Sequence, residues 1–577
     1  MYNFEIALAL EELADLLEFQ GEDFFKIRAY RQAARTLARH PVPVVEVYRQ
    51  KKLAGLPGVG KNIAAKVSEL IEKGYMNKLE ELRRQVPPGV REMMALPGVG
   101  PKRARLFYDH LGVQTLDDLY RAAQEKKLRR LPGIGSKTEF AIRQHIERLK
   151  ETPSIHLLNL ARLLAREMIA YLGELPGVQR VEITGGTRRW EETVSDLDLL
   201  VQTTDWETLA EALRSHPRVV EILEKDENRL QVQTLWGLPL EVLRAAEDNF
   251  WPLLVYSTGN KAHLQKLQDF FARRGWHLCE EGVKPLAGVA AEAIAPLPQW
   301  QDEEQVYREL GLQYIVPELR QGGEELVLAA AGVLPRLIET GDIKGDLHVH
   351  SDWSDGGASI EQLAERARQK GYEYLAITDH SQSLKVARGL SIEQLQEQYR
   401  QIDRLNAGFS DFTLLKGMEV DIKMAGELDY PDEILEQADV VVASVHSGFQ
   451  QEMPAMTRRI MQAIENPHVD IIGHLTGRML GQRPGYQLDV EKVLELAGKC
   501  GKILEINSSP ERLDLSPPHV RRALEHGAKI AVNTDAHDLQ RLEEIEYGVA
   551  VARRAGLTRE QVVNTLPLAD LRHILRR

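Results

Sequence analysis

Histidines and carboxylates recur at one kind of position in the C-terminal part of the chain, from about residue 340 onward. Each ends or follows a short apolar run of the type that forms a buried β-strand. Alternation along an extended segment places both members of a His-x-His or Asp-x-His pair on one face. The residues are His348, His350, Asp355, His380, Glu419, His446, His474, Asp535 and His537.

This set of side chains predicts a metal centre. Six imidazoles and three carboxylates are enough for three ions at about three protein ligands each, with positions left for water and substrate. Imidazole and carboxylate without thiolate favour Mn²⁺, Zn²⁺ or Fe²⁺. Such ions lower the pKa of bound water and so supply a hydroxide near neutral pH. The alternative, in which each histidine is an unrelated core or surface residue, does not account for so many ligand types at strand ends.

These ligands need a scaffold that brings the ends of several strands together. Apolar runs separated by amphipathic stretches predict parallel strands that alternate with helices and close into a βα barrel. The carboxyl ends of barrel strands meet at one face, where the chemistry of this fold lies. The seven expected strands cover residues 346–350, 374–378, 414–420, 440–445, 471–473, 503–506 and 529–533.

A second group of carboxylates lies in the middle of the chain. Asp196 and Asp198 belong to an expected strand over 195–200, and the period of two places them on the same face. With a third carboxylate from a neighbouring strand they would hold two ions, Mg²⁺ or Mn²⁺, for in-line attack on a triphosphate. The preceding turn, with Gly185 and Gly186, is expected to receive the phosphates. The alternative is a solvated strand face.

The N-terminal part repeats the pattern Leu-Pro-Gly-x-Gly, which begins at residues 56, 96 and 131. Glycines allow a turn with positive φ, and the helix that follows directs its first amides and positive dipole end at an anion. Three copies suit consecutive backbone phosphates and read no bases. In the alternative, the glycines only cap helices. The residues expected to bind these phosphates are Gly58, Gly60, Lys61, Gly98, Gly100, Lys102, Gly133, Gly135 and Lys137.

Composition and charge agree with an N-terminal part that binds phosphates and later parts that bind metal ions. The chain has 577 residues, 43% of them hydrophobic and 28% charged, which is typical of a soluble protein of several domains. Residues 1–150 carry 27 Lys and Arg against 19 Asp and Glu, whereas the whole chain has a net charge of −13. The basic first quarter indicates a polyanionic partner. We expect no membrane span, and with only two cysteines, a cytoplasmic protein.

The repeats resemble the helix-hairpin-helix motif of DNA repair proteins. The segment that runs from Lys26 and Tyr30 to Lys66, just after the first repeat, resembles the lyase domain of X family DNA polymerases. The resemblance implies that Lys66 forms a Schiff base with the sugar of an abasic site, and that Lys26 and Tyr30 bind its 5′-phosphate. In the alternative, Lys66 only contacts phosphate.

The middle of the chain resembles the palm of X family polymerases such as DNA polymerase beta. The resemblance makes Glu241 the third carboxylate and assigns nucleotide binding to Gly185, Gly186, Arg189, Tyr256 and Gly259. Several positions depart from the family pattern around this site. They are Gly186 for Ser, Trp190 for Gly, Glu241 for Asp, Leu243 for Arg, Ser257 for Phe, Leu264 for Asn and Gln268 for Arg. So many departures at one site predict weak or lost nucleotide addition, although the fold can persist.

The C-terminal pattern resembles the PHP domain, a trinuclear-metal phosphoesterase, with every ligand position filled. Arg478, in the sequence His-Leu-Thr-Gly-Arg, could contact a phosphate. The whole chain resembles bacterial X family DNA polymerases with a PHP domain. We therefore expect a multidomain α and α/β protein with a (β/α)7 barrel. The expected divisions are a lyase-like domain (1–85), helix-hairpin-helix fingers (86–152), palm (153–250), thumb (251–318), linker (319–340) and barrel (341–577).

The resemblance implies a DNA repair enzyme that acts on gapped, nicked or abasic-site DNA, with dNTP as a possible substrate. Its expected activity is a Mn-dependent 3′–5′ exonuclease in the barrel, together with processing of DNA ends or abasic sites. Two alternatives stay open: an active gap-filling polymerase with the nuclease as proofreader, and a DNA-break scaffold with both sites silent. A small-molecule phosphatase would leave the repeats unexplained.

Overall fold

A computed structural model of the chain describes residues 3–38, 40, 42–96, 98–151, 155–234, 236–288, 290 and 294–575. Its contacts divide the chain into two units. The first takes in residues 1–154 with segments 216–220 and 234–237, and the second takes in the rest. Pro97 of the middle repeat, and residues 152 and 153 at an expected domain boundary, lie outside the described residues. None of the helices in the described residues is long and apolar enough to cross a membrane.

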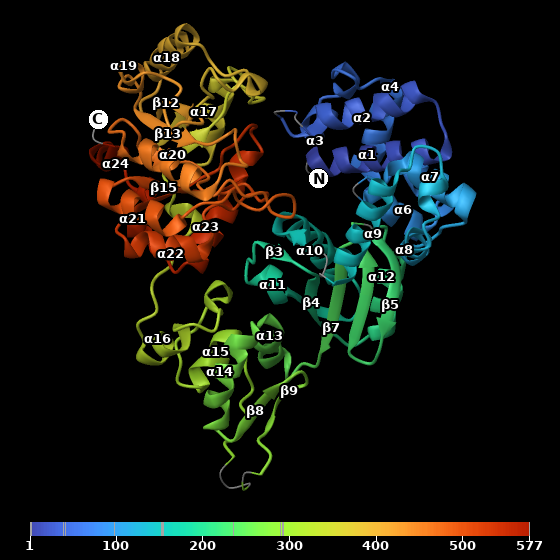
Figure 1. Cartoon of the computed structure of the whole chain (residues 1–577). Coiled ribbons are helices and arrows are strands. Elements are labelled where there is room, and N and C mark those ends of the chain that lie inside the picture. The colour runs from blue at the N-terminus through green and yellow to red at the C-terminus, as the bar shows by residue number, and fades with distance from the viewer. Residues whose placement is uncertain are drawn as a thin grey trace. The chain divides into compact units, whose positions relative to one another are not determined.

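In the first unit, the described residues up to 151 form helices that share one hydrophobic core (Figure 1, blue to cyan). Its helices form where apolar residues recur every three or four positions and so line one face. In the described residues they are α1 (Asn3–Gln20), α2 (Phe24–Ala38), α3 (Val44–Arg49), η1 (Leu53–Gly55), α4 (Lys61–Lys73), α5 (Asn77–Gln85), α6 (Pro88–Ala95), α7 (Gly100–Leu111), α8 (Leu116–Gln124), η2 (Leu128–Arg130) and α9 (Ser136–Glu151).

The three repeats are helix–turn–helix elements, as the sequence predicts. The turns join η1 to α4, α6 to α7, and η2 to α9. The first glycine of each turn, Gly58, Gly98 or Gly133, has a φ of 76°, 83° or 75°. A side chain at such a position is strained, whereas glycine adopts it freely. This requirement explains why the glycine recurs.

A five-stranded sheet follows, with strand order β2-β4-β7-β6-β5. Its strands are β2 (Val178–Ile183), β4 (Leu197–Thr203), β5 (Val219–Lys225), β6 (Arg229–Thr234) and β7 (Pro239–Ala245), accompanied by β1 (His156–Leu157), β3 (Thr193–Val194), α10 (Leu158–Gly173), α11 (Gly185–Arg188) and α12 (Trp206–Ser215). Two details differ from the prediction. The strand of the aspartate pair begins at Leu197, so Asp196 precedes it, and the expected turn after β2 is the short helix α11.

A helical segment with a two-stranded sheet comes next, packed around Phe271, Trp276 and Tyr307. It contains α13 (Phe250–Thr258), α14 (Lys261–Ala272), β8 (Trp276–Cys279), β9 (Gly282–Pro285), α15 (Glu303–Glu309), η4 (Pro317–Leu319) and α16 (Glu325–Ala331). α16 lies in the stretch expected to be a linker, and its Leu326 belongs to this same core. The stretch is therefore partly structured.

The C-terminal part is the predicted barrel of seven parallel strands. In sheet order these are β10 (Gly345–Val349), β11 (Tyr374–Ile377), β12 (Thr413–Asp421), β13 (Val440–Ser444), β14 (Ile471–Ile472), β15 (Ile503–Asn507) and β16 (Lys529–Asn533). A parallel bridge between Val349 and Ala536 links the first strand to the segment after the last. The sheet is thereby nearly closed into a cylinder.

Helices surround these strands (Figure 1, yellow to red). They are α17 (Ile360–Gln369), α18 (Ile392–Asn406), α19 (Asp432–Leu435), α20 (Met453–Glu465), α21 (Val490–Cys500), α22 (Pro517–Glu525), α23 (Ile545–Arg554) and α24 (Leu568–Leu575), with short turns η5 (Thr340–Asp342), η6 (Lys385–Ala387), η7 (Arg541–Glu544), η8 (Arg559–Gln561) and η9 (Val563–Thr565). A large apolar cluster lies between strands and helices. A smaller one, which includes Leu571 and Leu575 of α24, contains Leu347 and Val442. The strands are thus packed between two apolar clusters.

Candidate active sites

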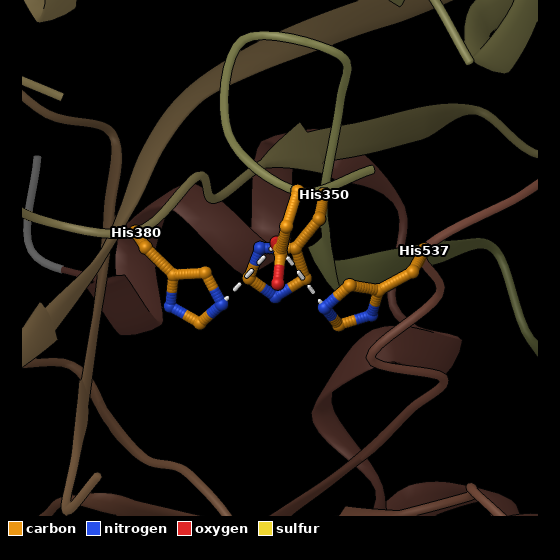
Figure 2. A group of neighbouring side chains, drawn as sticks. His350, His380 and His537 are labelled. Atoms are coloured by element: carbon orange, nitrogen blue, oxygen red, sulfur yellow. Dashed lines mark ion pairs between the residues drawn. The ribbon is translucent and has the colours of Figure 1, made fainter. Parts of the chain in front are cut away.

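The barrel brings the nine predicted metal ligands together. His348 lies in β10 and Glu419 in β12, and the other ligands lie in the segments that follow β10, β11, β13, β14 and β16. Figure 2 shows His380 and His537 on either side of His350, each joined by a dashed line to a shared carboxylate oxygen. That oxygen is Oδ1 of Asp355, at 3.5 Å from His380 Nε2 and 3.4 Å from His537 Nε2.

The ligands form three overlapping groups whose donor atoms lie within 4.8 Å of one another. The groups are His350, Asp355, His380 and His537; His348, His350 and Asp535; and His380, Glu419 and His446. His474 approaches the third group, with its Nε2 3.1 Å from Glu419 Oε1. Because His350 and His380 each belong to two groups, the groups form one continuous centre.

The donor atoms fit a cation. His348 Nε2, His474 Nδ1 and Glu419 Oε2 are buried and have no hydrogen-bond partner in the described structure. Burial and the neighbouring His537 and His380 lower the pKa of His350 to about 3, so its ring is neutral, as a metal ligand must be. Burial opposes protonation of His446, but the adjacent Glu419 and Asp421 together outweigh it and raise the His446 pKa to about 9. When His446 loses its extra proton, a divalent ion can take over the role of balancing the negative charge of Glu419.

Two buried carboxylates that the sequence did not single out hold the ligands in place. Glu505 Oε1 accepts a hydrogen bond of 2.7 Å from His348 Nδ1, and its Oε2 accepts one of 2.8 Å from the backbone N–H of His474. A proton on Nδ1 leaves Nε2 of His348 free to bind metal. The only signal in the sequence is a glutamate in the apolar strand Ile-Leu-Glu-Ile-Asn.

Asp379 has the corresponding role for the segment after β10. Its carboxylate accepts hydrogen bonds from the backbone N–H of Ser351 at 2.8 Å, from the Ser351 hydroxyl at 2.5 Å and from Ser354. This segment carries Asp355, so Asp379 fixes the position of that ligand. The residue directly precedes His380, and the Thr-Asp-His sequence could have indicated it.

Arg478 is already engaged in the structure. Its guanidinium donates to both carboxylate oxygens of Glu192, at 2.7 and 3.1 Å, and to the carbonyl oxygens of Arg512 and Leu513. A different guanidinium approaches the metal ligands, because Arg512 Nε lies 3.8 Å from Asp535 Oδ2. Sequence reasoning missed Arg512, which no periodic pattern marks.

The palm carboxylates also lie together. β4 and β7 run parallel with Asp198 opposite Glu241. Burial, Asp196 and Glu241 raise the pKa of Asp198 to about 7, as expected for neighbouring carboxylates without a cation between them. Glu241, however, is paired with the guanidinium of Arg229 on β6. The third carboxylate thus already has a positive partner from the protein.

Family models match four parts of the chain. They are a helix-hairpin-helix domain (residues 1–76), a SAM-like helix-hairpin-helix tandem (90–148), a DNA polymerase beta thumb (253–321) and a PHP domain (346–509). A curated relative, the DNA polymerase/3′-5′ exonuclease PolX of Bacillus subtilis strain 168, is 36% identical over 579 residues and covers all of both chains. The chain belongs to the bacterial X family of DNA polymerases with a PHP domain.

Other relatives match the barrel of this PolX family member alone. A probable phosphatase of Thermoanaerobacter sp. strain X514 is 34% identical over 235 residues, which are 38% of this chain and 89% of the relative. A probable phosphatase of Caldanaerobacter subterraneus is 29% identical over 237 residues, 38% of this chain and 86% of the relative. The barrel is thus shared with proteins of about its own length.

One departure of this palm from the family pattern, Trp190, makes specific contacts in the structure. Trp190 keeps a φ of 55°, the conformation that favours the glycine of the family pattern. Its ring lies 3.5 Å from the guanidinium carbon of Arg162 and makes an edge contact with Tyr547. Tyr256 lies in α13, and Gly259 follows that helix. The contacts of Trp190 with Arg162 and Tyr547 therefore pack the turn after α11.

The predicted DNA-binding residues lie in the first unit. Lys61 and Lys137 are exposed at the starts of α4 and α9, and the amine of Lys102 is 3.6 Å from Glu18. In the lyase-like segment, Tyr30 is buried and Lys26 pairs with Glu22 at 3.1 Å. Lys66 is half-buried in α4. Helix N-termini and lysine side chains are common partners of backbone phosphates in protein–DNA complexes.

Proposed function

We propose that the barrel is a Mn-dependent 3′–5′ exonuclease that also processes DNA ends or abasic sites. The observation that supports this most is the continuous centre of three overlapping ligand groups. Three ions, Mn²⁺ or alternatively Zn²⁺ or Fe²⁺, would be held by the nine ligands. When bound, they supply an ionised water near neutral pH and polarise the phosphate.

The residues of the chain have separate roles in this proposal. The histidines and carboxylates hold the ions, and Glu505 keeps the His348 ring in the tautomer that binds metal. Arg512, rather than Arg478, supplies a positive charge beside the centre, where it stabilises negative charge on the departing oxygen. Arg478 would need to release Glu192 before it could contact a phosphate.

We further propose that the palm extends DNA slowly or not at all. Asp196 and Asp198 could hold Mg²⁺ or Mn²⁺, with Glu241 as the third ligand only if Arg229 gives it up. Displacement of reacting atoms by about 1 Å lowers the rate roughly a hundredfold. The turn with Gly185, Gly186 and Arg189, and the residues Tyr256 and Gly259, would then retain the shape of a nucleotide site without its function.

The N-terminal hairpins would bind the DNA backbone of gapped, nicked or abasic-site substrates. Lys66 would form the Schiff base with an abasic sugar, beside a 5′-phosphate held by Lys26 and Tyr30. We keep the six-part division expected from the sequence as a proposal, with α16 as a helix inside the linker.

One assay separates the candidate activities. End-labelled gapped DNA is incubated with Mn²⁺ and the four nucleotides, so that shortening and lengthening of the labelled strand are read together. Dominant shortening supports the proposal, and rapid lengthening contradicts the slow palm. A preparation that binds no transition metal and leaves the DNA unchanged would instead favour a silent scaffold.

A gap-filling polymerase with a proofreading nuclease is the second candidate. The name of the Bacillus subtilis relative, which covers the whole chain, combines both activities. The names of the shorter relatives suggest a phosphatase, but that function leaves the hairpins without a role. Extension of a gapped primer at a rate comparable with shortening would establish the second candidate.

A further inference from the structure

The turn after α11 contains an acidic side chain, Glu191, to which neither proposed activity assigns a role. Arg189 Nε and Nη2 donate to Glu191 Oε1 at 3.0 and 2.5 Å, and Arg189 Nη1 donates to the carbonyl oxygen of Thr258. The guanidinium is mostly buried, with 14% of the Arg189 side chain exposed. Glu191 therefore occupies the polar edge of the arginine that a bound phosphate would need.

The second oxygen of Glu191 lies against the glycine of the same turn. A β-carbon built on Gly186 would be 3.1 Å from Glu191 Oε2, and the N–H of Glu191 donates to the carbonyl oxygen of Gly186 at 3.0 Å. The carboxylate thus spans the space between Arg189 and Gly186. A serine in place of Gly186 would bring its side chain against the Glu191 carboxylate, whereas glycine leaves room for that carboxylate.

This space belongs to the palm site. A β-carbon on Gly185 would collide with the carboxylate of Asp198, and one on Gly259 would be 3.1 Å from Arg189 Nη1. The other arginine of the turn is also engaged: Arg188 donates to both oxygens of Glu303 at 2.8 Å and to the Thr258 hydroxyl at 2.6 Å. Both cations of the turn already face protein oxygens.

We propose that Glu191 is an internal substitute for a nucleotide phosphate, which holds Arg189 and excludes a nucleoside triphosphate from the palm. The inference rests on the proposed slow palm and names a residue responsible for it. A triphosphate must break the Arg189–Glu191 pair and then lie beside a carboxylate of the same sign. The first step removes two charge-assisted hydrogen bonds, and the second adds repulsion.

The test is calorimetric titration of the full-length protein, without DNA, with Mg²⁺–tripolyphosphate and with Mg²⁺–dATP. Glu191→Gln and Glu191→Ala should tighten the binding of both probes by about tenfold or more, which corresponds to roughly 1.4 kcal/mol. Glu211→Gln on α12, an exposed glutamate 3.6 Å from Arg214, is the matched control and should bind like wild type. Adding Arg189→Gln to Glu191→Gln should remove the gain.

The possible results lead to separate conclusions. If Glu191→Gln melts at the wild-type temperature but binds both probes no more tightly than wild type, the inference is wrong while the slow palm stands. A gain that survives Arg189→Gln also overturns it, because the arginine would not be the site. If wild type itself binds dATP tightly and fills gaps rapidly, the proposed function fails first.

Discussion

At the scale of single residues, the predicted metal ligands are held in place by buried side chains that are not themselves predicted ligands. His348 could be recognised from its spacing, because strand alternation predicts where a His-x-His pair points. Glu505 could not, since its role depends on contacts with His348 and His474, which are distant in the sequence. Arg478 was predicted from the sequence to be available for a phosphate. Its guanidinium is instead paired with Glu192, which is 286 positions away, and no local pattern reveals such a pair.

Glu505→Gln should weaken metal binding. An amide can present its NH₂ group to His348 Nδ1, and the ring then adopts the tautomer that protonates Nε2, the metal-binding nitrogen. We expect Mn²⁺ affinity, measured by equilibrium dialysis and metal analysis, to fall by about 10–100-fold. Glu433→Gln, an exposed residue at the start of α19, should retain wild-type affinity. Unchanged metal content in the Glu505 variant would show that it does not orient His348.

The palm should show a pH-dependent stability that originates at Asp198. Its pKa is about 7 in the folded protein against an ordinary value of 3.8, so between these two pH values the folded palm binds a proton that the unfolded chain has lost. Stability is therefore lost as pH rises through this interval. Asp198→Asn removes this loss, and hydrogen exchange in β4 and β7 without divalent ions should be slower than in wild type at pH 8. A difference between variant and wild type that is as large at pH 4 as at pH 8 would contradict this explanation.

At the scale of elements, the sequence predicts a helix, turn or strand correctly where a short local pattern determines the backbone conformation. The repeat glycines predict the hairpin turns because positive φ is required at Gly58, Gly98 and Gly133. The seven barrel strands follow from their apolar runs. The start of β4 was misplaced by two residues, since Ser195 and Asp196 continue the alternating pattern but precede the ladder with β7. The helix α16 was missed because its packing partners lie in the preceding segment.

The hairpins should give DNA affinity without base specificity. The logarithm of the affinity should fall linearly with the logarithm of salt, by about 0.9 per phosphate neutralised on duplex DNA. Lys61→Ala and Lys137→Ala should each reduce this slope by about one, as measured by fluorescence anisotropy. Lys499→Ala, on α21 of the barrel and paired with Glu495, is the control. A salt-independent affinity, or preference for one sequence, would argue against phosphate binding.

At the scale of the whole molecule, two candidate active sites occupy separate sheets of one chain. The fold of both follows from the sequence, as the family comparisons confirm, because each sheet has its own hydrophobic pattern. How fast the palm works does not follow, because it depends on pairs such as Glu241 with Arg229 that only the folded chain reveals.

The two sites should be separable by mutation. His348→Ala with His350→Ala should abolish 3′ degradation of labelled DNA, because two of the three ligand groups lose members, while DNA affinity changes little. Asp196→Ala should leave degradation nearly unchanged, and Glu241→Asp alone should not give rapid extension. If DNA degradation persists in the metal-depleted double variant, the barrel is not the nuclease. Gap filling by wild type that Asp196→Ala abolishes would show that the palm is active.

Glu419 has a further consequence for how the centre fills and empties. One carboxylate, 1% exposed, has its oxygens within 3.6 Å of ring nitrogens of His348, His350, His380, His446 and His474. An ion that leaves any one group changes the charge felt by the other two through this shared anion. That departure leaves more of the carboxylate's negative charge to the ions that stay, so they are held more tightly: during chelation, ions should leave one at a time, and partly filled molecules should be well populated.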